Sequence, residues 1–176
     1  NPIYLRDSLL KGVVTLQPFG QLKPESLSSF ELGYKGLLLD NRLLVDIYGY
    51  YGQFNNFLAR TEVVQSKSGT QIVQADADTG SIYSIPINSP DKITTYGFGI
   101  GLDYKIYRNF TISINAASDN LNDVPDNIVA SFNSPKYKFN ASIGNSGFGT
   151  GKRLGFNIAY RWQDAFFFEA DLANGT

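Results

Sequence analysis

The sequence predicts an all-β fold, an antiparallel segment of a transmembrane β-barrel with about six strands. The first observation is alternation: from residue 96 to 106, large apolar side chains take turns with Gly, Asp and Lys. Successive side chains of a strand point to opposite faces, so this run has one oily and one small, polar face. The second is strand length, ten residues or more against the usual five or six. The third is the order of the connections, alternately short and long, as in outer-membrane barrels.

Three hairpins follow one another along the chain, at residues 27–57, 93–117 and 136–165. In the first, the tight turn is predicted at Asp40-Asn41, because these residues tolerate left-handed backbone. The second turns at residues 107–109, and the third turns in a glycine-rich stretch, NSGFGTGK. All short turns therefore lie at one end of the sheet, which we expect to be the periplasmic end.

The segments between the hairpins, residues 58–92 and 118–135, are long and polar, and we expect them to be extracellular loops. Residues 1–26 lack sustained periodicity and carry three prolines, so we expect an extracellular loop there too, with the start of a further loop at 166–176. Inside the second loop, the apolar pieces 63–64 and 82–87 could pair as a small hairpin. We expect loops 58–92 and 118–135 to take part in ligand capture or in docking a lid.

The two faces of the predicted sheet differ in chemistry. The apolar face carries its large aromatic residues near both strand ends, which suits the two membrane interfaces. The opposite face carries more charges than a dry core accepts, whereas a water-filled or plugged lumen would hold them. The lumen-facing candidates are Glu31, Lys35, Asp46, Asp103, Lys105 and Arg161. The lipid-facing candidates are Tyr96, Phe98, Ile100, Leu102, Tyr160 and Trp162.

Composition excludes several classes of function. The chain has 176 residues with neither Cys nor His, so it holds no disulfide, thiolate metal site, His-rich zinc site or Ser-His-Asp triad. A formal charge of -1 without a basic block gives no reason to expect nucleic acid as a partner. We expect no catalytic residue, no resident metal and no cofactor, and therefore no enzyme.

Two motifs resemble ligand loops but fail at required positions. GNSGFGTGKR at 144–153 has Ser146 and Arg153 where a phosphate loop needs Gly and Ser or Thr. DADTGS at 76–81 starts like a calcium loop but has Gly80 at its fifth position and Ile87 at its twelfth. A looser extracellular calcium site, there or around residues 119, 123 and 126, stays open.

One segment suggests a family. LKPESLSSFELGYKGLLLDNRLLVDIYGYYGQFNNF, residues 22–57, resembles the mid-barrel signature of TonB-dependent outer-membrane receptors. SFNSPKYKFNASIGN and GFNIAYRWQDAFFFEADLANG are similar to downstream strands of the Bacteroidota-type receptors, so the likeness spans about residues 22–176. It implies a place in the C-terminal half of a barrel of about 22 strands, filled by a plug and located in a Gram-negative outer membrane. It also implies import of a scarce nutrient, with energy from the TonB complex.

The sequence also departs from that pattern. It shows no plug and no energy-coupling box, and about six strands cannot close so wide a barrel. An open sheet in lipid would leave unpaired backbone groups at two edges, at prohibitive cost. We therefore expect the chain to be a fragment of a longer protein, with the plug region that meets the TonB complex elsewhere.

Three interpretations stay open from the residues alone. An active importer is the first, with outer-membrane lipid and the TonB complex as partners. A passive porin or an outer-membrane adhesin is the second, and a soluble ligand-binding β-barrel is the third. The imported molecule is open between glycan, peptide, siderophore and vitamin, as is the presence of a surface lipoprotein over the barrel.

Overall fold

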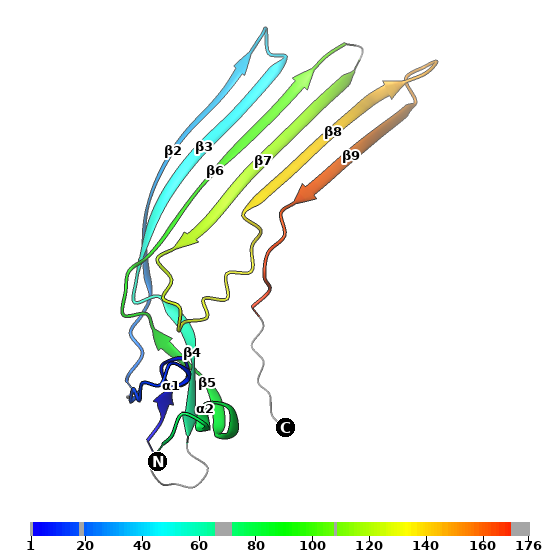
Figure 1. Ribbon diagram of the computed structural model, residues 1–176. Coiled ribbons are helices and arrows are strands. Elements are labelled where there is room, and N and C mark those ends of the chain that lie inside the picture. Colours follow the sequence, from blue (N-terminus) through cyan, green and yellow to red (C-terminus); the bar gives the residue numbers. More distant parts are fainter. Residues whose placement is uncertain (1, 18–19, 66–71, 108, 170–176) are drawn as a thin grey trace.

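The computed structural model describes residues 2–17, 20–65, 72–107 and 109–169. Six long strands form one antiparallel sheet in the order β2-β3-β6-β7-β8-β9, and a second sheet has the order β1-β4-β5 (Figure 1). This confirms the predicted all-β, antiparallel fold. In the part of the chain described, the sheet does not close on itself, and β2 and β9 are its edges. No helix among these residues is both long and apolar enough to span a membrane.

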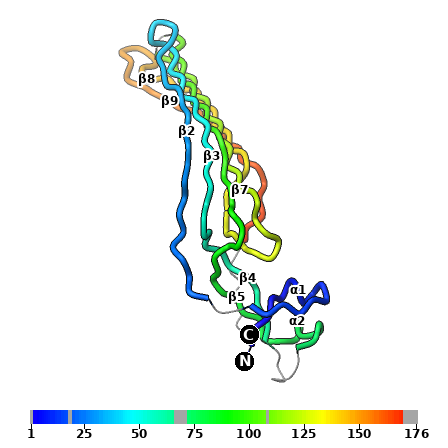
Figure 2. The backbone as a smooth tube through the Cα atoms, turned by 90° about the vertical axis from the view of Figure 1, so that its left-hand side faces the viewer, coloured from blue at the N-terminus to red at the C-terminus, as the bar shows by residue number. Residues whose placement is uncertain are grey.

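The strands of the large sheet are long and evenly matched. Four of them have 13 residues, which at about 3.4 Å per residue corresponds to roughly 44 Å of extended chain. Their bounds are β2 Ser26–Leu38, β3 Leu43–Asn55, β6 Ile93–Lys105, β7 Phe110–Asn122, β8 Tyr137–Phe148 and β9 Leu154–Gln163. Seen from the side, they make a single curved layer (Figure 2).

The short turns lie together at one end of the sheet, as predicted. Between β2 and β3, Leu39, Asp40 and Asn41 all have positive φ, which Asp and Asn accept more readily than other non-glycine residues. Between β8 and β9, Gly149 and Gly151 have φ values of 78° and 80°, where a side chain would be strained.

Two strands are longer than the sequence suggests. β7 continues to Asn122, five residues beyond the predicted end at 117, and β8 runs into the predicted turn up to Phe148. The polar residues 118–122 look like loop in the sequence, but they pair with residues 94–98 of β6. β8 tolerates its extension through a register shift between Asn145 and Phe148.

The second sheet and two short helices form a compact unit beyond the other end of the strands, here called the loop module (Figures 1 and 2). Its elements are β1 Tyr4–Leu5, α1 Arg6–Leu10, β4 Leu58–Gln65, α2 Asp76–Thr79 and β5 Ser81–Asn88. The antiparallel β4–β5 pair confirms the small hairpin predicted inside residues 58–92. Residues 1–26 are not loop throughout, because β1 gains its partner, β4, from a distant part of the chain.

The hydrophobic core lies at the loop end, not beneath the large sheet. One cluster lies within the loop module, around Leu9 and Val64, and a second joins it to the sheet end, around Phe57 and Ile93. Elsewhere in the described part of the large sheet, Val45 is the buried apolar side chain. A single-layer sheet without a core of its own requires another apolar environment for its oily face.

Candidate functional site

Strand register places the charged candidates of the sequence on one face of the large sheet, here called the polar face. One row crosses all six strands through Lys35, Asp46, Gly101, Asn115, Asn140 and Arg161. By the two-residue period, Glu31 shares this face with Lys35 on β2, and Asp103 and Lys105 share it with Gly101 on β6. The six predicted charged residues therefore point the same way.

Only some of these charges meet. Lys35 Nζ lies 2.8 Å from Asp46 Oδ2, a cross-strand ion pair whose side chains stay largely exposed. Asp103 and Arg161 both line a hollow of ≈ 520 Å³ on β6 to β9. Its other polar lining residues are Ser113, Asn115, Asn140, Ser142 and Asn157. The hollow can thus offer many neutral hydrogen-bonding groups to whatever lies against it, with Asp103 and Arg161 as its charged residues.

The apolar candidates share the opposite face, here called the apolar face. Ile47 lies opposite Ile100, and Phe139 lies opposite Trp162. Large side chains on this face are uncovered: Trp162 is 46% exposed and Tyr160 is 61% exposed. Further exposed residues of this face include Phe30, Leu32, Tyr34, Tyr51, Tyr96, Phe98 and Ile158. An apolar surface this extensive marks an interaction site.

The apolar face has a measurable height. Tyr96 and Tyr104 stand near the two ends of β6, eight residues apart, with Ile100 midway. The separation is about 27 Å along the strand and about 21 Å in depth for a barrel tilt of roughly 40°. This is close to the apolar band of about 25 Å that outer-membrane barrels present to lipid.

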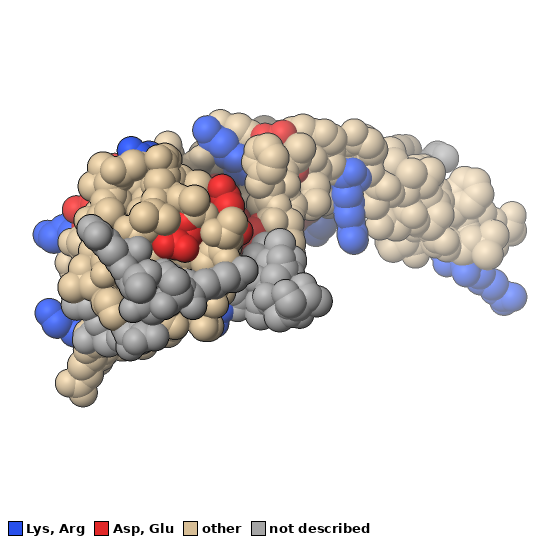
Figure 3. Space-filling model, turned by 60° about the horizontal axis from the view of Figure 1, so that its bottom comes forward, with Lys and Arg blue, Asp and Glu red and all other residues tan. Residues whose placement is uncertain are grey.

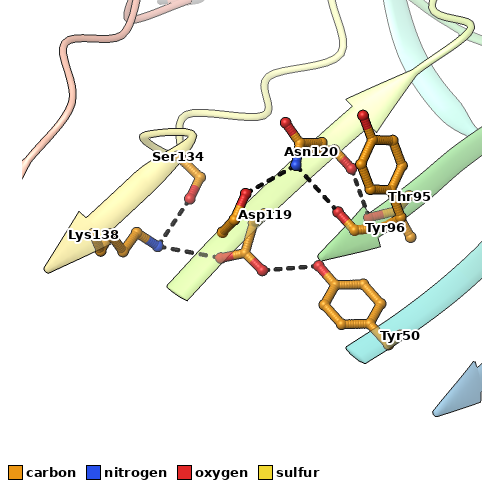
Figure 4. Close-up of polar contacts among 8 residues, drawn as sticks. Tyr50, Thr95, Tyr96, Asp119, Asn120, Ser134 and Lys138 are labelled. Atoms are coloured by element: carbon orange, nitrogen blue, oxygen red, sulfur yellow. Dashed lines mark hydrogen bonds and ion pairs between the residues drawn. The ribbon is translucent and has the colours of Figure 1, made fainter. Parts of the chain in front are cut away.

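A polar network on the polar face connects three strands and a loop near the loop end (Figure 4). Tyr50 Oη donates a hydrogen bond to Asp119 Oδ1 at 2.8 Å. Lys138 Nζ lies 3.4 Å from Asp119 Oδ2 and donates to Ser134 Oγ at 3.0 Å. The network holds β3, β7, β8 and the residues before β8 in one arrangement.

Tyrosine rings lie across glycines on the same face. Tyr48 is opposite Gly99 and Tyr50 is opposite Gly97, and each ring occupies the space that a Cβ on its glycine would need. A Cβ on Gly97 would also collide with the backbone oxygen of Ser118. Each ring covers backbone that its glycine leaves bare, a device used to stabilise sheets. The runs GFGIG and YGYYG are the signal of this contact in the sequence, but the alternation alone does not predict which tyrosine meets which glycine.

At the loop end, Arg6 holds the loop module together. Its guanidinium donates to Glu62 Oε2 at 2.7 Å, to Asp78 Oδ1 at 3.4 Å and to the Ala77 carbonyl at 2.8 Å. The hydrogen bond to Glu62 raises the pKa of Arg6. These contacts join α1, β4 and α2 and could not be found from the sequence, where the partners are up to 72 residues apart.

Loop segments are also joined to each other where they leave the large sheet. The Glu25 carboxylate accepts the N–H of Leu58 at 2.7 Å, and Asn88 Nδ2 donates to the Asn56 carbonyl at 2.7 Å. Glu169, after β9, accepts the N–H of Ser131 at 2.7 Å. The loop end is therefore a set of segments in defined contact.

The described residues contain no group of three or more Asp or Glu placed to hold a metal ion. The three acidic residues of the calcium site considered at residues 119, 123 and 126 each contact different groups. Asp119 joins Tyr50, Asp123 accepts from Thr94 Oγ1 at 2.7 Å, and Asp126 lines a small hollow beside Arg6.

Comparison with known proteins matches the chain to a family model. The model of the family described as "TonB dependent receptor-like, beta-barrel" matches residues 10–176. No curated protein and no solved structure matches the chain.

Proposed function

The chain belongs to the TonB dependent receptor-like β-barrel family, and from this premise we propose that it forms part of the wall and of the outer mouth of a barrel that imports a scarce nutrient. The family is one of receptors and transporters, not of enzymes, and its members are found in the Gram-negative outer membrane and act in TonB-linked transport. The observation that carries the proposal is the separation of a polar and an apolar face over six long strands.

In this proposal the apolar face meets lipid and the polar face lines the lumen. Burial of a large exposed apolar face in hydrocarbon avoids the cost of leaving it in water. The neutral groups around Asn115 and Asn140, with Asp103 and Arg161, would meet water, a plug or the passing nutrient.

The open edges support a wall that continues on both sides. β2 and β9 each expose a row of backbone N–H and C=O groups, which lipid cannot satisfy. Neighbouring strands would pair with them in a barrel of about 22 strands. The TonB complex would supply energy through a plug that residues 1–176 do not include.

The proposed orientation puts the short turns in the periplasm and the loop module outside the cell. The loop module, with its own core around Leu9 and Val64, would then stand at the mouth of the lumen. Its defined contacts suit a surface that receives a ligand before transport.

Paired single-cysteine variants of the full-length, membrane-inserted protein test the facing of the sheet. Ile100→Cys and Gly101→Cys lie at the same depth on opposite faces of β6, and Gly101 has room for a side chain. We expect a membrane-impermeant maleimide to label position 101, and a quencher carried in the lipid tails to reach a fluorophore at position 100. Reversed accessibility would contradict the proposed facing, and equal aqueous labelling at both would favour a soluble sheet.

A further inference from the structure

The short-turn end of the large sheet carries exposed cations. Arg42 lies in the β2–β3 turn, Lys105 ends β6, and Lys152 and Arg153 lie in the β8–β9 turn; all four are exposed. Their side chains make no hydrogen bond or ion pair with any residue that the structure describes. We call these four residues the basic rim. Asp40 is the acidic residue within the same turns, and Asp103 lies two positions before Lys105.

Charge is distributed differently at the loop end. There Arg6 is paired with Glu62 and Asp78, and Lys11 with Asp7. Figure 3 shows both acidic and basic residues on the near, loop-end part of the molecule, whereas the distant, fainter part of the sheet shows Lys or Arg without acids on the face in view. Lys23 and Lys92 are exposed at the loop end as well, so what distinguishes the short-turn end is that its cations gather with few acids among them.

The turns that carry the basic rim are joined to each other. The N–H of Lys105 donates to the Arg42 carbonyl at 2.8 Å, and the N–H of Ser146 donates to the Asn109 carbonyl at 3.2 Å. These bonds connect the first turn to the end of β6 and the second turn to β8, close to the third turn. The charges thus project from a continuous edge of sheet.

Aromatic residues of the apolar face stand directly beside the basic rim. Phe156 contacts both Phe110 and Phe148 edge to face, with ring centroids 6.0 and 6.2 Å apart. Tyr104 precedes Lys105 on β6 and faces the same side as these rings. Aromatic rings followed by Lys and Arg match the chemical gradient from acyl chains to head groups.

We propose that the basic rim binds the phosphate-bearing head groups of anionic phospholipids in the leaflet at the short-turn end. Lipid is the occupant that the geometry favours, because Arg42, Lys152 and Arg153 lie in turns directly beyond the apolar face that would already lie in the bilayer. Lys105 ends the polar side of β6 at the same edge of the sheet. Each Lys or Arg near an anionic surface attracts it strongly enough to raise the association constant of an anionic lipid about fivefold. This inference rests on the proposed function, since it requires the sheet to be embedded.

Lipid selectivity of the full-length protein in vesicles tests the proposal. The protein is reconstituted in phosphatidylcholine with a trace of spin-labelled phosphatidylglycerol or spin-labelled phosphatidylcholine, and the fraction of immobilised label gives relative association constants. We expect phosphatidylglycerol to be preferred severalfold, with the preference falling as salt is raised. Replacing the four rim residues by Gln should lower the phosphatidylglycerol association constant at least fivefold, while phosphatidylcholine stays unchanged.

A matched variant uses three exposed lysines of the loop end, Lys11→Gln, Lys23→Gln and Lys92→Gln, and should keep the preference. Loss of the preference in this variant but not in the rim variant would overturn the proposal. So would a rim variant that keeps full lipid selectivity yet loses transport, which would make the rim a protein-binding surface. Failure of wild-type protein to enter vesicles would contradict the proposed function itself, and is recognised by its absence from the vesicle fraction.

Discussion

Placing a charge on the apolar face at mid-depth is the sharpest test of how the sheet is embedded. Ile100 stands four residues from Tyr96 and four from Tyr104, so it lies about 10 Å in depth from each interface marker for a tilt of roughly 40°. Its neighbours across the strands are Ile47 and Ala116, which offer no partner for a guanidinium.

An Arg at the bilayer midplane on the lipid face costs about 2 to 4 kcal/mol. Ile100→Arg should therefore lower the equilibrium constant for folding into the membrane about 30-fold to 1000-fold. The assay is unfolding of the full-length protein in vesicles by guanidinium chloride. The folded fraction at each concentration is measured as the fraction that resists unfolding in unheated sample buffer.

Gly101→Arg is the control at the same depth. A Cβ there would come no closer than 3.7 Å to Asp46, and the polar row beside it can satisfy the guanidinium. We expect this variant to assemble almost as well as the wild type. Normal folding of Ile100→Arg together with failure of Gly101→Arg would refute the assigned faces. Normal folding of both would refute a lipid contact at this position.

Three further variants test the contacts that hold the sheet and the loop module. Gly97→Ala should lower the guanidinium chloride midpoint by the equivalent of about 2 kcal/mol, because the new Cβ would collide with the backbone oxygen of Ser118. Gly101→Ala should be close to neutral, and equal effects of the two substitutions would contradict the crowding at Gly97. Tyr50→Phe removes a hydrogen bond to a carboxylate and should destabilise the protein by about 1.5 kcal/mol in the same titration. Tyr48→Phe is its control, because the Tyr48 hydroxyl makes no hydrogen bond within the described residues. An equal loss of stability in this variant would show that the hydrogen bond from Tyr50 to Asp119 does not stabilise the sheet. Arg6→Gln should speed amide hydrogen exchange in residues 58–65 and 76–79 without changing 137–148, and unchanged exchange in the loop module would show that Arg6 does not stabilise it.

The sequence alone predicted the six long strands, the sides that their residues face and the separation of short turns from long loops. These features are local, because the two-residue period lies within the sequence of each strand and the turn-forming residues lie directly between neighbouring strands. It also predicted the β4–β5 hairpin from two short apolar pieces. It placed the ends of β7 and β8 too early, because the polar residues at 118–122 resemble a loop until their partners on β6 are known.

Only the tertiary structure decided which residues meet. The contact of Tyr50 with Asp119, the bonds of Arg6 and the joining of the turns beneath the basic rim connect residues far apart in the chain. Such contacts depend on the register between neighbouring strands, and a slip of one residue would turn every side chain to the other face. The faces of this protein were therefore determined locally, whereas the hollow, the network and the rim exist because six strands align in one register.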